Sequence, residues 1–314
     1  MTSVFLTVDT EFAWRHHAAG LDIATIYQRS VEPAGVGLTH HLDLLARHGL
    51  KACFFVDPMP AMVYGLKPVA RMVEAILAAG QEVQLHCHAN WAGARAGDRG
   101  ASYARFNLNE YGLAEQTDLL AGARDLLVAA GAPTPIAFRA GAYAANDDTL
   151  AALASLGFEY DSSHNGLYPG GIGLPRDLIA PTLRAGLIEL PVTLIEDLPG
   201  SLRPFQICAL SSGESGQALA HAAREKHAAV TIVSHSFELA NRLGTGVNAV
   251  HVRRFDALCA MLAASHAVLP TVHFADRPAL ALGQDDRPLA AARLRTHWRQ
   301  AEQLWSNIFA ERAA

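Results

Sequence analysis

The sequence lacks several features that mark particular classes of protein. Its four cysteines include no CxxC pair, and three of them lie in apolar runs, so we expect buried thiols and neither disulfides nor a zinc finger. No apolar run approaches the ~20 residues that a membrane span needs. The net charge of −5 gives no excess of basic residues, which argues against a nucleic-acid partner. We see no internal repeat and no low-complexity linker.

The composition instead fits a large buried core. Hydrophobic residues make up 51% of the 314 residues and charged residues 18%. The first expected strand begins near residue 3 and leaves no room for a signal peptide, so we predict a cytoplasmic enzyme.

Strand-like and helix-like segments alternate along the chain. This pattern predicts parallel β-α-β units, and seven or eight of them in a chain of this length predict an irregular (β/α)7–8 barrel. The expected strands are 3–9, 52–56, 82–88, 135–139, 158–161, 187–191, 229–234 and 268–273. The expected helices are 31–49, 67–80, 108–131, 146–156, 214–227, 246–265 and 286–312.

Two features complete the expected organisation. Residues 91–107, 165–186 and 196–213 are predicted to be loops after strands, at the end of a barrel where active sites form. We assign residues 1–285 to the barrel and 286–314 to a C-terminal helix. That helix is expected to pack on the barrel or against a partner subunit, in which case the protein would be a homo-oligomer.

Five expected strands end in polar side chains, which a barrel would gather at one end. These side chains are Asp9 and Glu11, His86 and His88, Arg139, Asp161, and His235. Residues two apart on a strand share a face, so each of the first two pairs points one way. Carboxylates together with imidazoles are typical of a hydrolytic metal centre.

In this order the motifs resemble the polysaccharide deacetylase family, the NodB-like members of carbohydrate esterase family 4. The motifs are Thr7-Val-Asp-Thr-Glu11, His86-Cys-His-Ala-Asn90, Arg139-Ala-Gly-Ala-Tyr143, Asp161-Ser-Ser163 and Ile232-Val-Ser-His235. The resemblance covers about residues 3–240 and implies a barrel of the NodB-homology type. The Asp-Thr-Glu and Leu-His-x-His variants look like a divergent branch, similar to deacetylases from surface-polysaccharide gene clusters.

The chain departs from the family pattern at two positions. Thr10 stands where the family has its metal-binding acid, so Glu11 is expected to take that role. Asn90 stands where the family has its second histidine. If the strand continues to residue 88, His88 is the substitute ligand, and if the chain turns earlier, Asn90 is the alternative.

The resemblance also implies a role for each remaining residue. Asp9 would be the general base, Arg139 would orient it, and His235 would protonate the leaving amine. Asp161 would hold His235. Alternatively, Arg139 could be only a salt-bridge partner, and Asp161 only a turn residue before two serines.

The implied reaction is removal of an N-acetyl or other N-acyl group from an amino sugar, with a divalent metal, expected to be Zn²⁺. Trp14 and Trp91 could stack on sugar rings or cap the core, and Tyr143 is a third candidate for binding the carbohydrate substrate. Two alternatives are an allantoinase-like cyclic amide hydrolase and an inactive carbohydrate-binding protein of the same fold.

Overall fold

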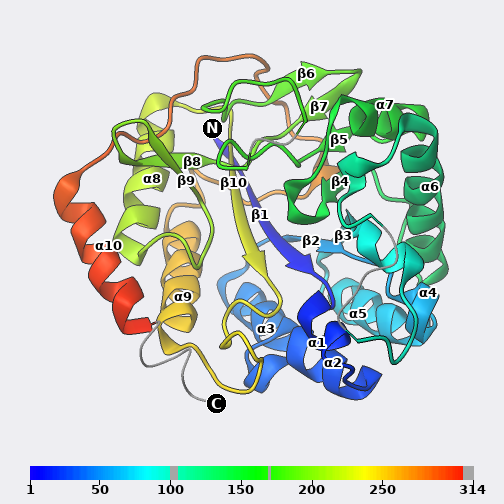
Figure 1. The fold of residues 1–314 in the computed structure, drawn as a ribbon. Helices are drawn as coiled ribbons and strands as arrows, with labels where there is room; N and C mark the ends of the chain where they lie inside the picture. The colour runs from blue at the N-terminus through cyan, green and yellow to red at the C-terminus, as the bar shows by residue number, and fades with distance from the viewer. Residues whose placement is uncertain (100–104, 169–170, 307–314) are drawn as a thin grey trace.

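The computed structural model describes residues 1–99, 105–168 and 171–306, and a single large sheet organises them (Figure 1). The sheet has eight strands in the order β10-β1-β2-β3-β4-β5-β7-β6, and its neighbours are parallel except for β6 with β7. The strands are β1 (Ser3–Thr10), β2 (Cys53–Val56), β3 (Glu82–Cys87), β4 (Ala137–Ala140), β5 (Tyr160–Asp161), β6 (Thr182–Arg184), β7 (Leu187–Glu189) and β10 (Ala229–His235). A separate hairpin consists of β8 (Leu194–Leu198) and β9 (Ser201–Pro204).

Helices surround the sheet (Figure 1). The α-helices are α1 (Trp14–Ala18), α2 (Ile23–Ser30), α3 (Leu38–His48), α4 (Ala61–Tyr64), α5 (Lys67–Ala78), α6 (Leu113–Ala129), α7 (Asp147–Ser155), α8 (Ser212–Glu225), α9 (Ala249–Ala264) and α10 (Arg293–Trp305). The short 3-10 helices are η1 (Pro33–Gly35), η2 (Ala89–Gly93), η3 (Leu108–Glu110), η4 (Gly141–Tyr143) and η5 (Phe274–Asp276). Among the described residues, no helix is long and apolar enough to cross a bilayer.

The segment after β7 connects the two sides of the sheet. The Val192 N–H donates to the His164 carbonyl at 3.0 Å, next to β5, and the Thr193 N–H donates to the Thr231 carbonyl of β10 at 3.1 Å. The sheet therefore curls into an irregular α/β barrel of the NodB type, as the alternation of strands and helices predicts.

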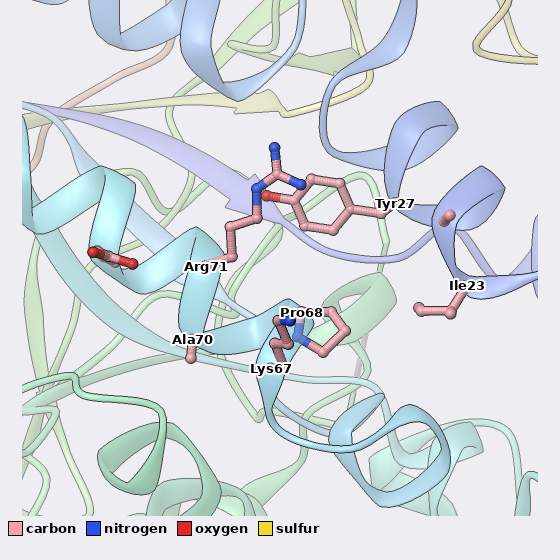
Figure 2. A pocket seen from close by; sticks show the side chains of 8 residues that line it. Ile23, Tyr27, Lys67, Pro68, Ala70 and Arg71 are labelled. Atoms are coloured by element: carbon pink, nitrogen blue, oxygen red, sulfur yellow. The ribbon is translucent and has the colours of Figure 1, made fainter.

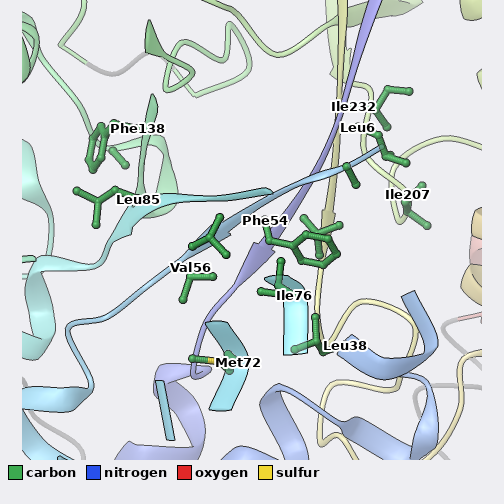
Figure 3. Close-up of a cluster of buried hydrophobic side chains, with 14 of the residues drawn as sticks. Leu6, Leu38, Phe54, Val56, Met72, Ile76, Leu85, Phe138, Ile207 and Ile232 are labelled. Carbon is green, nitrogen blue, oxygen red and sulfur yellow. The ribbon is translucent and has the colours of Figure 1, made fainter. Parts of the chain in front are cut away.

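Successive side chains of β1 point to opposite sides of the barrel wall. Val4, Leu6 and Val8 belong to the large hydrophobic cluster. Figure 3 shows Leu6 among the side chains of this cluster. Phe5 belongs to a smaller cluster with Cys53 and with residues of β4 and β10, on the opposite face. Because successive strand residues point to opposite faces, Thr7 and Asp9 lie on the same interior side as Phe5. The interior side of β1 is therefore apolar at the start of the strand and polar toward its C-terminal end.

The structure differs from the prediction in several local elements. The expected strand 268–273 contributes one bridge, between Val4 and Thr271, because the segment meets only the start of β1. The expected loop 196–213 contains the end of β8 and all of β9. The sequence pattern also missed α1 and α2.

The C-terminal helix α10 contacts the rest of the chain through ion pairs. Arg254 of α9 bonds to Glu302 at 2.6 Å, and Arg299 bonds to Asp197 of β8 at 2.6 Å. Residues 307–314 of the expected helix lie outside the described residues. The division at residue 285 stays a prediction.

Candidate active site

Glu11, His86 and His88 meet at the ends of β1 and β3. Their ligand atoms all lie within 4.8 Å of one another. Glu11 Oε2 is 3.1 Å from His86 Nε2 and also contacts His88 Nε2. Burial opposes the charge of Glu11, yet the neighbouring histidines hold its pKa well below the usual range. The pKa of His88 is lowered by burial but raised more strongly by Glu11, to about 9.

This donor set fits a divalent metal. His86 Nδ1 lies 2.7 Å from the Arg139 carbonyl and donates a hydrogen bond to it, so Nε2 is the nitrogen that faces Glu11 and would bind a metal. A hydrogen bond of this kind is the usual way in which a metal-binding histidine is oriented. His88 fits beside it because Gly141 has no Cβ, which would come within 2.5 Å of His88 Nδ1. The alternative ligand, Asn90, is fully buried in η2.

Asp9 is held by a buried arginine. Arg139 Nη1 donates to Asp9 Oδ1 at 2.7 Å and to Thr7 Oγ1 at 2.7 Å, and the guanidinium lies 4.5 Å from the Phe55 ring centre. Burial works against the charge of Arg139, but Asp9 raises the pKa of the arginine. This is the orienting contact that the motif comparison predicts, and it leaves Asp9 Oδ2 facing His235 Nε2 at 3.8 Å.

The acid beside His235 is Glu238, where the resemblance implied Asp161. His235 Nδ1 lies 3.6 Å from Glu238 Oε2, and the His235 backbone N–H donates to the same oxygen at 3.0 Å. Burial lowers the pKa of His235, but Glu238 and Asp9 raise it more, to about 9. Burial raises the pKa of Glu238, but His235 lowers it more, to about 2. Glu238 lies in the turn after β10 and does not directly follow an apolar strand. Its position three residues after His235 was the signal in the sequence that the two side chains could meet.

Asp161 is fully buried in a turn with Ser163. Its carboxylate accepts the Ser163 backbone N–H at 3.2 Å and the Ser163 hydroxyl at 2.7 Å, which matches the turn alternative. Its second partner is the fully buried carboxyl group of Glu189, and this contact is a hydrogen bond only if one group carries a proton. Burial and the adjacent Asp161 raise the pKa of Glu189 well above its usual value, so we assign the proton to Glu189.

The shared proton predicts a pH-dependent contribution to stability. Because the folded-state pKa of Glu189 is raised, its contribution is complete below the unfolded pKa of about 4.3 and is lost as pH rises through the folded pKa. Glu189→Gln removes this pH-dependent term. The change of its thermal unfolding midpoint from pH 5 to pH 8 should therefore be more favourable than that of wild type by roughly 1–2 °C, which corresponds to about 1 kcal/mol. The exposed Glu74→Gln serves as control, and a Glu189→Gln variant with the wild-type pH dependence would contradict the assignment.

The aromatic candidates differ in exposure. Trp91 is 1% exposed and packs 5.0 Å from both the Trp14 and His17 rings, so it has no open face for a sugar. Trp14 is half-buried. Tyr143 is 9% exposed and stacks on Tyr168 at 5.7 Å. Its φ of +56° costs of order 1–3 kcal/mol, and such strain clusters at functional sites.

The sequence prediction overlooked a further acid, Asp57, directly after β2. It is fully buried, and its Oδ1 accepts the Met59 backbone N–H at 3.0 Å. Burial raises the pKa of Asp57 to about 6, against the opposing effect of His88 and His86. The signal was available in the sequence, because the expected strand 52–56 is followed directly by this acid.

A groove of ≈ 590 Å³ between α2 and α5 lies apart from these residues (Figure 2). It is lined by Ile23, Ala24, Tyr27, Lys67, Pro68, Ala70, Arg71 and Glu74. None of the candidate residues lines it, so we assign it no part in the chemistry.

Several solved structures are similar to this chain, and those with a TM-score above 0.5 share its fold. A candidate polysaccharide deacetylase from Mycobacterium smegmatis is 17% identical with a TM-score of 0.54, over 96% of this chain and 91% of that one. A 4-alpha-glucanotransferase from Thermococcus litoralis is 8% identical with a TM-score of 0.54, over 88% of this chain and 40% of that one. A family 4 carbohydrate esterase from Streptomyces lividans, solved with acetate, is 14% identical with a TM-score of 0.44, over 93% and 98%. At these identities the likeness concerns the fold alone.

The sequence comparison is more specific than the fold. No curated protein matches the sequence. Residues 35–160 match the family model described as polysaccharide deacetylase, and this segment carries the histidine and arginine motifs. Residues 35–160 of the chain are therefore similar to the polysaccharide deacetylase family, as the motifs predict.

Proposed function

We propose that this protein is a metal-dependent hydrolase that removes an N-acetyl group from an amino sugar of a polysaccharide or its precursor. The observation that supports this proposal is the clustering of Glu11, His86 and His88. Asp9, which forms an ion pair with Arg139, lies on β1, and Glu11 directly follows that strand. One carboxylate and two imidazoles form a common catalytic zinc set, and Zn²⁺ is the metal that we expect. When bound, the metal would polarise the substrate carbonyl and activate a water molecule.

Asp9 and His235 would each carry out one of the two proton transfers of the reaction. Asp9 Oδ1 is engaged by Arg139, so Oδ2 accepts the proton of the attacking water. His235 Nε2 faces the same oxygen and donates a proton to the nitrogen as the C–N bond breaks. The products are acetate and the free amine. We propose that Trp14 and Tyr143 contact the sugar.

A cavity of ≈ 380 Å³ beside His235 supports a sugar substrate. Its volume falls within the range of small-molecule sites. His235, Gln206 and Phe237 are among its lining residues, and the Arg15 guanidinium lies 5.1 Å from the Phe237 ring centre. The leaving amine would then remain on the sugar inside this cavity, next to its proton donor.

The pairing of His235 with Glu238 predicts a shift in the rate–pH profile. Glu238→Gln removes the charge that raises the pKa of His235, so that pKa should fall from about 9 toward about 6.5. Because the acid works only when protonated, the alkaline limb of kcat/KM should move to lower pH. The NMR titration of His235 should move with it. Glu214→Gln, another buried acid, should change neither, and an unmoved limb in Glu238→Gln would contradict the pairing.

Acetate release tests the proposed reaction. The Zn²⁺-loaded protein should release acetate from N-acetylglucosamine oligosaccharides or a nucleotide-linked N-acetyl sugar, and chelation should stop it. Allantoin and hydantoin serve as comparison substrates. Opening of the cyclic amides without acetate release would contradict the proposal in favour of a cyclic amidase. A metal-loaded protein that binds sugars and hydrolyses none of them would instead indicate an inactive carbohydrate-binding protein.

A further inference from the structure

Asp57 directly follows β2, which lies between β1, the strand that Glu11 follows, and β3, the strand that carries His86. The register pairs Thr10 of β1 with Val56 of β2, and Val56 with Leu85 of β3. The next residues along these three parallel strands are Glu11, Asp57 and His86, so Asp57 continues the middle strand. The Asp57 backbone N–H donates to the Thr10 carbonyl at 3.0 Å, which extends the β1–β2 pairing by one position. Glu11 and His86 nevertheless contact each other across this row.

The Asp57 carboxylate is only half satisfied. Its Oδ1 accepts the Met59 N–H, which accounts for a local turn. Its Oδ2 is buried and has no hydrogen-bond partner among residues 1–99, 105–168 and 171–306. An oxygen buried in this way carries an uncompensated desolvation cost. The turn therefore explains one oxygen, while the other has no partner in the part of the chain that the structure describes.

We propose that Asp57 is a metal-binding residue, the second carboxylate of the site that holds Glu11, His86 and His88. This inference rests on the proposed metal-dependent function. Carboxylate oxygens are ordinary ligands of zinc and of the harder divalent metals. Two carboxylates with two neutral imidazoles would also balance the two positive charges of the ion. The site would thus draw on β1, β2 and β3.

The isosteric variant Asp57→Asn tests this role with metal affinity as the readout. Asparagine keeps an Oδ1 acceptor for the Met59 N–H but removes the negative charge. We expect Zn²⁺ affinity, measured by competition with a chromogenic chelator, to fall roughly 10- to 100-fold. Without metal the variant should unfold at the same or a higher temperature than wild type, because a buried charge without a partner is gone. Added Zn²⁺ should then raise the thermal unfolding midpoint of Asp57→Asn by less than it raises that of wild type.

Two further variants keep the result interpretable. Glu189→Gln alters an equally buried carboxyl group away from the site and should leave Zn²⁺ affinity unchanged. Asp57→Ser, which also offers a short acceptor, replaces Asp57→Asn if the latter fails to fold. Zn²⁺ affinity within about twofold of wild type in the folded Asp57 variant would overturn the inference alone. A folded wild type that binds no Zn²⁺ would overturn the proposed function and the inference with it.

Discussion

Replacing Glu11 by glutamine is expected to abolish stoichiometric metal binding and, with it, hydrolysis. Glu11 is the carboxylate of the three-residue cluster, and its Oε2 contacts the Nε2 atoms of both His86 and His88. Without that charge, the three-residue cluster offers two imidazoles and a glutamine amide, which is a much weaker ligand than a carboxylate. The loss of Zn²⁺ affinity should exceed the roughly 10- to 100-fold that a supporting residue causes. Competition titration against a chromogenic chelator measures it directly.

The control for Glu11 is a glutamate on β3, two strands away in the sheet. Glu82 is buried at the opposite end of β3, where it accepts the backbone N–H groups of Phe274 and Ala275. Glu82→Gln should keep wild-type metal affinity even if it loses some stability. Wild-type affinity in Glu11→Gln would remove Glu11 from the ligand set, and the division of roles between Asp9 and Glu11 would have to be reversed.

Asp9→Asn is expected to separate chemistry from metal binding. The amide of asparagine cannot take a proton from water, so kcat should fall by about 10²- to 10⁴-fold, the range that a positioned base contributes. Metal content should stay at the wild-type level, because Asp9 bonds to Arg139 and is not one of the three clustered ligands. Steady-state acetate release and elemental analysis on the same preparation provide both values.

A conservative change on the same strand checks that the Asp9 result is local. Thr7 also accepts a hydrogen bond from Arg139 Nη1. Thr7→Ser keeps this hydroxyl and should keep most of kcat. If Asp9→Asn lost metal together with activity, Asp9 would be a ligand, and if it kept activity, the base would have to be another residue.

The strand ends were the most predictable part of this protein. Asp9, Glu11 and His86 follow apolar runs, and parallel strands bring their ends to one edge of the barrel. The spacing of His86 and His88 also predicted that both would turn to one side, and their rings lie 4.9 Å apart. Local pattern was sufficient here because the alternation of side chains is set by the backbone itself.

Contacts between distant segments were less predictable. Where Asp161 lies relative to His235 depends on how residues 192 and 193 close the barrel, and no local pattern records that closure. The burial of Trp91 likewise follows from its packing with Trp14 and His17, which belong to α1, a helix that the sequence pattern missed. Side-chain chemistry could be predicted from strand ends, but partners across the barrel could not.

The metal content of the purified protein tests the central claim most directly. We predict about one equivalent of a transition metal per chain, expected to be zinc, bound by Glu11, His86 and His88. Elemental analysis after incubation with Zn²⁺ and removal of the excess should find it in wild type and miss it in Glu11→Gln. A folded wild-type protein that retains no transition metal under these conditions would contradict the account.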